Sequence, residues 1–354
     1  MSRRGIVGVL LASFIAVSAC GGDDSGDTTT TAAPTTTTAA PTTTAPAPDD
    51  TTAPGDTTTT TAAVEMIDIT VALIPILDFT PIYVALDEGI FERHGLNVTL
   101  QEIFSSPGLV SAVTSGSADI ATTSATQAVT GISNGLPIKI VSGGSISPTA
   151  GNTEILVQAD SDIQTFADLA GRTVNAVALQ GLFHLGTLSA VENDGGDWMT
   201  VEAIPGQQPD LGALLQAGRV DAIVIQEPFL SQFVAEFGFR SLGNPYATLG
   251  YDIPAGVWIS SIEQTENEPE VMRRFRAAMA EASDFAQNNE GVVRAKIPEI
   301  TTLTAEQVEN LALPTFAGDI PEASMTSMGN SMLTFGWLKY LPSLNQMLWQ
   351  DPEG

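Results

Sequence analysis

The sequence has a single cysteine, Cys20, and only two histidines, His94 and His184. Since no cysteine follows position 20, disulfides and thiolate nucleophiles are excluded from the body of the protein. The two histidines lie far apart, and neither an HExxH motif nor a paired metal-ligand spacing occurs. These absences argue against an enzyme, and no catalytic residue, metal site or cofactor is expected.

Basic residues are also scarce, because 13 lysines and arginines stand against 41 aspartates and glutamates, for a net charge of −28. So negative a chain repels nucleic acid and anionic lipid surfaces, which excludes both as binding partners. The charge favours solubility outside the cell.

Residues 1–19 are typical of an export signal peptide. Arg3 and Arg4 give a basic start, and the apolar stretch from Gly5 to Val17 is shorter than the roughly 20 residues that a membrane span needs. The segment Val17-Ser18-Ala19-Cys20 resembles the lipobox of bacterial lipoproteins, in which the cysteine becomes the lipidated first residue. The alternative is an ordinary signal followed by a chance cysteine.

After Cys20, residues 21–63 consist almost entirely of Thr, Ala, Pro, Gly, Ser and Asp. Such a segment cannot bury enough apolar surface to fold, so we expect 20–63 to be a lipid-anchored, disordered tether with a reach on the order of 130 Å. Its Thr/Pro tracts resemble those that are O-glycosylated in actinobacterial surface lipoproteins. The expected location is the outer face of the cell membrane in a Gram-positive or actinobacterial type of envelope, with the lipid as the only membrane contact.

The body from Val64 onward alternates strand and helix patterns, which predicts an α/β fold. Two segments within it align without gaps at an offset of 102 residues, namely 109–122 (LVSAVTSGSADIAT) and 211–224 (LGALLQAGRVDAIV). Each predicts a helix, a glycine stop, an aspartate and a buried strand. We therefore expect two similar lobes whose strand-end loops, 122–124 and 225–227, line one cleft. Chance recurrence of a common local arrangement is the alternative.

Several motifs, in order and spacing, resemble a branch of the periplasmic binding proteins. They are PIYVA (81–85), DEGIF (87–91), HGLNV (94–98), SGSADI (115–120), DLAGRTV (168–174), GRVDA (218–222) and EPF (227–229). The branch includes nitrate, sulfonate, taurine and thiamine-pyrimidine-precursor binders and is named for its similarity to the NMT1/THI5 proteins. The likeness covers roughly 66–240, and the C-terminal 60 residues match only loosely.

The resemblance implies a type II periplasmic-binding-protein fold, with two α/β lobes and a ligand cleft between them. Lobe 1 would comprise 65–157 and 249–354 and lobe 2 would comprise 158–248, with hinge crossings near Val157-Gln158 and Thr248–Gly250. The implied function is capture of a small solute by lobe closure, followed by delivery to the permease and ATPase subunits of an ABC importer. A monomer is expected. The alternatives are a surface sensor or interaction protein and an enzyme on the same scaffold.

Candidate ligand-binding residues follow the predicted strands or begin the predicted helices. They are Asp78, Phe79, Thr80, Ser105, Ser106, Thr123, Ser124, Gln127, Gln180, Gly181, His184, Gln226 and Glu227. Structural alternatives remain for the helix caps at Ser105 and Ser106, for a packed His184 and for a turn-fixing Glu227.

An aromatic wall with polar neighbours, such as Phe79 offers, is suited to holding a flat ring. Since the strand-end loops carry no Lys or Arg, we expect a neutral or weakly cationic heterocycle, such as a thiamine-pyrimidine or flavin precursor. Phe79 would stack on it, and Ser124, Gln127 and Glu227 would hydrogen bond to it. A sulfonate, nitrate or taurine is the alternative, because helix N-termini near Ser106 and Gln180 can hold an anion without a basic side chain.

Overall fold

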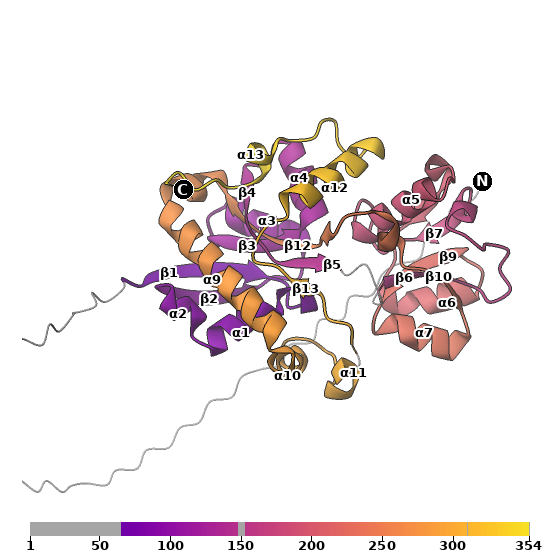
Figure 1. Cartoon of the computed structure of the whole chain (residues 1–354), viewed down its shortest axis with the longest axis horizontal. Helices are drawn as coiled ribbons and strands as arrows, with labels where there is room; N and C mark the ends of the chain where they lie inside the picture. The colour runs from indigo at the N-terminus through magenta and orange to yellow at the C-terminus, as the bar shows by residue number, and fades with distance from the viewer. Residues whose placement is uncertain (1–64, 148–152, 310, 354) are drawn as a thin grey trace, which may run out of the picture. The chain divides into compact units, whose positions relative to one another are not determined.

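The computed structural model describes residues 65–147, 153–309 and 311–353 (Figure 1). The predicted signal peptide, Cys20 and the tether to residue 63 lie outside the described residues. Within the described part of the chain, no helix is both long and apolar enough to cross a membrane.

The first sheet has five strands in the order β2-β1-β3-β12-β4 (Figure 1). Strand β1 is parallel to β2 and β3, whereas β12 is antiparallel to β3 and β4. Its strands are β1 (Ile67–Leu73), β2 (Leu96–Glu102), β3 (Ile120–Ser124), β4 (Ile138–Gly143) and β12 (Gly256–Ser261). The helices of this lobe are η1 (Leu77–Phe79), α1 (Thr80–Asp87), α2 (Ile90–Arg93), α3 (Ser106–Thr114), α4 (Ala125–Ser133), α8 (Ile262–Asn267) and α9 (Pro269–Asn288).

The second sheet has five strands in the order β10-β6-β9-β7-β8. Strand β9 is parallel to β7 and antiparallel to β6. Its strands are β6 (Thr153–Val157), β7 (Thr173–Asn175), β8 (Glu202–Ile204), β9 (Ala222–Gln226) and β10 (Arg240–Gly243). The helices of this lobe are η2 (Ala167–Leu169), α5 (Leu182–Asn193), η3 (Trp198–Thr200), η4 (Gln208–Asp210), α6 (Leu211–Gln216), α7 (Phe229–Phe237) and η5 (Pro245–Thr248).

The first chain crossing differs from its expected position at Val157-Gln158. Strand β6, which ends at Val157, pairs with β9 and β10 of the second sheet, so the chain has already entered the second lobe by Thr153. The apolar run of β6 predicts a buried strand but carries no information about which sheet it joins. On the way back, β11 (Ile253–Pro254) pairs with β5 (Ser145–Ser147) of the first lobe.

The C-terminal segment returns to the first lobe. It contains α10 (Glu290–Ile300), α11 (Ala305–Glu309), β13 (Thr315–Phe316), α12 (Glu322–Thr334) and α13 (Leu344–Met347). Strand β13 completes a small antiparallel sheet with β5 and β11. Near the end of the chain, the amide of Trp349 donates a 2.8 Å hydrogen bond to the carbonyl of Ile140 in β4.

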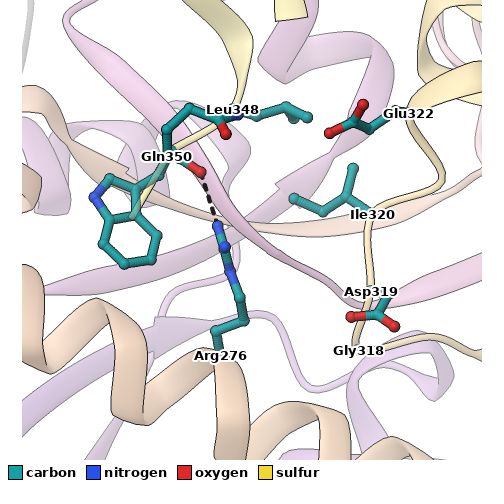
Figure 2. A pocket seen from close by; sticks show the side chains of 8 residues that line it. Arg276, Gly318, Asp319, Ile320, Glu322, Leu348 and Gln350 are labelled. Carbon is teal, nitrogen blue, oxygen red and sulfur yellow. Dashed lines mark hydrogen bonds between the residues drawn. The ribbon is translucent and has the colours of Figure 1, made fainter. Parts of the chain in front are cut away.

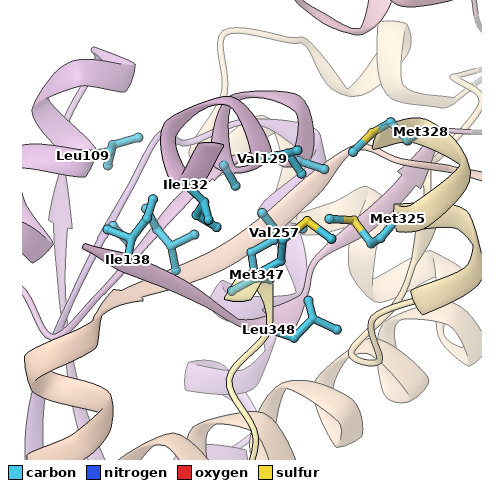
Figure 3. Packing of buried hydrophobic residues seen from close by; sticks show 14 of the residues in the cluster. Leu109, Val129, Ile132, Ile138, Val257, Met325, Met328, Met347 and Leu348 are labelled. Carbon is cyan, nitrogen blue, oxygen red and sulfur yellow. The ribbon is translucent and has the colours of Figure 1, made fainter. Parts of the chain in front are cut away.

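One hydrophobic core joins the first sheet, α4 and the C-terminal helices (Figure 3). Met325 and Met328 of α12 and Met347 of α13 are almost fully buried there beside Val129 of α4. The unbranched methionine side chain fills irregular space of this kind. Leu185 of α5 belongs to the same core, so the second lobe is packed against the first by buried apolar contact on this side.

The internal repeat expected from the sequence is present as two equivalent units. Helix α3 and strand β3 flank a left-handed Gly116 at φ 74°, and α6 and β9 flank a left-handed Gly218 at φ 62°. Only glycine adopts this conformation without a steric penalty, which is why the helix stops there in both copies.

The starts of α1 and α3 are set by local contacts. Thr80 is the first residue of α1, since η1 precedes it and its hydroxyl donates to the carbonyl of Leu77 at 2.8 Å. Helix α3 begins at Ser106, and its N-cap is the extended Ser105.

Candidate ligand-binding cleft

A small inner cavity of about 150 Å³ lies where both lobes meet. Its walls come from the segment after β1, the end of β3, the start of β12 and the start of α5. The lining residues are Ile76, Asp78, Phe79, Thr123, Ser124, Leu182, Ala255 and Gly256. Four of the expected ligand-binding residues are therefore brought together here, namely Asp78, Phe79, Thr123 and Ser124.

The polar edge of the inner cavity is built at the carboxyl end of β3. Ser124 ends the strand and caps α4, since its hydroxyl accepts a 3.3 Å hydrogen bond from the amide of Gln127. The hydroxyl of Thr123 donates to the side-chain oxygen of Gln127 at 3.3 Å. Gln127 itself is exposed and does not line the cavity, so it can influence the cavity only by orienting the hydroxyls of Thr123 and Ser124.

The aromatic wall is fixed by packing from behind. Phe79 is 4% exposed and makes an edge contact with Trp258, with ring centroids 5.2 Å apart. Gly256 lets the ring lie close to β12, because a Cβ at this position would come within 2.8 Å of two atoms of the Phe79 ring. A rigid ring loses little conformational entropy when a ligand packs against it.

Asp78 brings a carboxylate to this wall. The hydroxyl of Ser145 donates a 2.6 Å hydrogen bond to its Oδ1 and accepts one of 3.0 Å from the amide of Gly256. Burial raises the pKa of Asp78, and the hydrogen bond from Ser145 offsets this only in part. A positively charged or hydrogen-bond-donating ligand group would stabilise the carboxylate.

A larger outer cavity of about 670 Å³ shares Ile76 with the inner one. The first lobe contributes residues after β1 and β2, the second lobe contributes the end of β9 and the start of α7, and α10 with the loop after it forms the remaining wall. Its lining residues include Tyr83, Glu102, Phe104, Gln226, Glu227, Phe229 and Glu299. The expected Gln226 and Glu227 thus lie in this part of the cleft.

Glu227 is oriented by the first turn of α7. Its carboxylate accepts hydrogen bonds from the hydroxyl of Ser231 at 2.6 Å and from the amide of the same residue at 3.2 Å.

On the other lobe, burial raises the pKa of Tyr83 to about 12, and the neighbouring charge of Glu102 adds to the effect. Phe104 is 76% exposed, which is unusual for a phenylalanine that lines a cavity.

The other expected residues lie outside both cavities. Thr80 is buried in α1, Ser105 is exposed at the cap of α3, and Ser106 begins that helix. Gln180 and Gly181 precede α5, whose first residue, Leu182, does reach the inner cavity.

His184 has structural contacts instead. Its Nδ1 accepts a 3.0 Å hydrogen bond from the amide of Gln180, which assigns the proton of the neutral ring to Nε2. The ring lies against Trp337, with centroids 4.9 Å apart. Burial lowers its pKa to about 4. These contacts match the packed histidine that was the structural alternative.

Sequence reasoning missed the residues that tertiary contact brings to the cleft. Gly256 begins β12 and Ala255 directly precedes it, and the sequence places both far from β1 and β3. Tyr83 lies within the family-like PIYVA motif, which identifies the family but does not indicate that this residue lines the cleft.

A separate cavity of about 280 Å³ in the first lobe surrounds Arg276 of α9 (Figure 2). The guanidinium donates 2.9 Å hydrogen bonds to the carbonyls of Val141 and Trp349 and lies 4.6 Å from the Trp349 ring centroid. Asp319 and Glu322 line the same cavity (Figure 2). Arg276 therefore anchors the C-terminal segment, and we assign this cavity a structural role.

Within the described ranges, no group of three or more His, Cys, Asp or Glu side chains is arranged to hold a metal ion.

Comparison with known proteins gives one family and a consistent fold. The sequence profile of the family described as "NMT1/THI5 like" matches residues 76–290. No curated protein sequence matches the chain. Among solved structures, the periplasmic aliphatic sulphonate binding protein SsuA from Escherichia coli is similar with a TM-score of 0.65 and 18% identity, over 80% of this chain and 97% of that chain.

Two further structures agree with this result. The ligand binding component of an ABC-type import system from Staphylococcus aureus has a TM-score of 0.64 and 13% identity, over 79% of this chain and 96% of that one. The periplasmic nitrate-binding protein NrtA from Synechocystis PCC 6803 has a TM-score of 0.60 and 13% identity, over 80% and 84%. The two-lobed periplasmic-binding-protein fold expected from the sequence is confirmed.

Proposed function

This chain belongs to the NMT1/THI5-like family, and from that premise we propose that it is the extracytoplasmic solute-binding component of an ABC importer. It captures a small polar solute between its lobes and hands it to a permease, without covalent chemistry. The observation that carries the proposal is the cleft, whose two cavities take walls from both lobes. A solute held there would favour a closed arrangement of the lobes over an open one.

The proposed ligand is a neutral or weakly cationic ring compound. Phe79 supplies a fixed aromatic wall, Ser124 supplies a hydroxyl, and Glu227 supplies an acceptor on the opposite lobe. The similar structures from Escherichia coli and Synechocystis are named for sulphonate and nitrate, so anions are the alternative to be tested.

A thermal-shift panel of aminopyrimidines, flavin precursors, sulfonates, taurine and nitrate tests the proposal. A ligand at about 100 times its dissociation constant stabilises the folded state by about 2.7 kcal/mol. In Gly256→Ala, the new Cβ would push the Phe79 ring into the inner cavity and should abolish the shift. Circular dichroism of the variant checks that the fold survives. If no solute shifts the melting temperature, the transport proposal fails.

We also propose that the protein is held at the outer face of the membrane by lipid on Cys20, after removal of residues 1–19. The basis is the sequence alone, since this region lies outside the described residues. Cys20→Ala should appear in the medium or remain unprocessed. Lipid detected on the variant by mass spectrometry, together with membrane partition, would contradict this assignment.

A further inference from the structure

Three carboxylates from separate elements face the same cleft. Asp78 comes from η1, Glu102 ends β2, and Glu227 follows β9 of the other lobe. A fourth, Glu299, is paired with Lys296 at 2.5 Å. Of the described residues, no lysine or arginine lines either cavity or forms an ion pair with the first three. The cleft itself is therefore negatively charged.

Of these three carboxylates, Asp78 is the one whose charged form is disfavoured by burial, because burial has removed part of its hydration. Apart from the backbone amide of Asp78 itself, Ser145 is the only described residue that donates a hydrogen bond to this carboxylate. A buried or half-buried carboxylate is costly unless it is paired or fully hydrogen bonded. Asp78 lines the inner cavity, where a group of a bound ligand could pair with its carboxylate.

A second, independent observation comes from Tyr246 of η5. This residue is 1% exposed, and its hydroxyl has no hydrogen-bond partner among the described residues. Burial raises the pKa of Tyr246, and the nearby Asp78 raises it further, so the two groups lie within electrostatic range of each other. Buried hydroxyls without a partner are rare in folded proteins. The surroundings of Asp78 therefore include a second polar group that no described residue satisfies.

The outer cavity adds surface suited to the organic part of a cation. Tyr83, Phe104 and Phe229 line it from both lobes. Aromatic faces attract organic cations through the ring quadrupole, and the attraction increases when water is excluded. Closure over a ligand would exclude water at these rings.

We propose that the cleft selects a small organic cation, with its protonated nitrogen against Asp78 in the inner cavity and its carbon skeleton against the aromatic residues of the outer one. The inference rests on the proposed binding function and deepens it. It separates this chain from the similar structures that are named for sulphonate and nitrate.

The test uses matched probes on ethyl, benzyl and pyrimidinylmethyl skeletons, each carrying an ammonium, a hydroxyl or a sulfonate group. Isothermal titration with the full mature protein should rank the ammonium member first in any skeleton that binds, with the alcohol about tenfold or more weaker. Asp78→Asn should remove most of this preference. Glu227→Gln should weaken the ammonium probes less, and Glu263→Gln, which alters an exposed carboxylate of α8 away from the cleft, should have no effect.

Salt dependence gives a second reading on the same probes. The association rate of a cation with so acidic a protein should fall as ionic strength rises, and tryptophan fluorescence in stopped flow would report it.

The outcomes separate the two proposals. If a sulfonate member binds best, or if Asp78→Asn leaves ammonium binding unchanged, the cation proposal is overturned while the binding function stands. If none of the probes binds and the broader solute panel also produces no shift, both proposals fail.

Discussion

Asp119 and Asp221 make the same contact in the two lobes. Oδ2 of Asp119 accepts a hydrogen bond from the amide of Thr70 at 2.7 Å, and Oδ2 of Asp221 accepts one from the amide of Thr173 at 2.8 Å. In each case the amide belongs to the parallel strand that neighbours the strand following the aspartate. The aspartate of the sequence repeat therefore ties its own helix-strand unit to the adjacent strand.

Removal of this contact should destabilise each lobe. Asp221→Ala leaves the amide of Thr173 without its carboxylate acceptor, which costs about 1–3 kcal/mol in the free energy of unfolding. Asp119→Ala should cost more, because Gln264 also donates to its Oδ1 at 2.8 Å. Urea unfolding measures both. Asp160→Ala, an exposed aspartate of the same lobe as Asp221, is the control and should stay within about 0.5 kcal/mol of the wild type. Equal effects of Asp160→Ala and Asp221→Ala would contradict the assignment.

His184 should make the folded state sensitive to mild acid. Its folded pKa of about 4 lies below the ordinary value of 6.5, because burial against Trp337 disfavours the charged ring. The unfolded chain therefore takes up a proton between about pH 6.5 and pH 4 that the folded protein does not, and stability is lost as the pH falls through that window. His184→Asn retains an acceptor for the amide of Gln180 but does not titrate. The wild type should lose more unfolding free energy than the variant between pH 7 and pH 4.5, whereas parallel pH profiles would refute the prediction.

The sequence predicted most of the fold because its signals are local. Gly116 and Gly218 with Asp119 and Asp221 marked the repeat, and polar residues after buried strands marked Thr123, Ser124 and Glu227 as cleft residues. The partner of β6 was not predictable in this way, since its residues would suit either sheet. Leu182 and Gly256 reach the inner cavity only through the approach of distant elements, which no periodicity reports.

Gly318 should tolerate no side chain. A Cβ there would lie 2.4 Å from the Cα of Ala280, so α9 and the segment after β13 would have to separate. The carbonyl of Gly318 also accepts hydrogen bonds from Ser142 at 2.9 Å and from the amide of Gly143 at 3.0 Å. We expect Gly318→Ala to cost about 1–3 kcal/mol through overpacking. Gly291→Ala in α10 meets nothing within 4 Å and should instead be neutral or stabilising by up to about 1 kcal/mol. Thermal melts of the two variants that shift in the same direction would contradict this difference.

Asp78 should destabilise the ligand-free protein once its carboxyl is ionised. Burial raises the folded pKa of this carboxyl above its ordinary value, so the folded state retains its proton to a higher pH than the unfolded chain does. The stability gained from that retained proton is present at low pH and is lost as the pH rises through the folded pKa. The charge of Asp78 raises the pKa of the neighbouring Tyr246, so the Tyr246 phenol stays neutral throughout this range.

Above its folded pKa, Asp78 is thus a half-buried charge held mainly by Ser145, and its replacement by an uncharged residue of the same shape should help the empty protein. Asp78→Asn keeps an oxygen for the Ser145 hydroxyl. We expect it to raise the unfolding free energy by on the order of 1 kcal/mol above the folded pKa of the wild-type carboxyl, with the gain shrinking as the pH falls through that pKa and the carboxyl is protonated. Ser145→Ala is the converse variant and should lower stability at pH 7, because the carboxylate loses its donor.

Differential scanning calorimetry across pH would distinguish the two variants. An Asp78→Asn variant less stable than the wild type at pH 7 would show that the carboxylate stabilises the empty cleft. A gain in stability accompanied by loss of ligand binding would place Asp78 among residues kept for function at the expense of the fold.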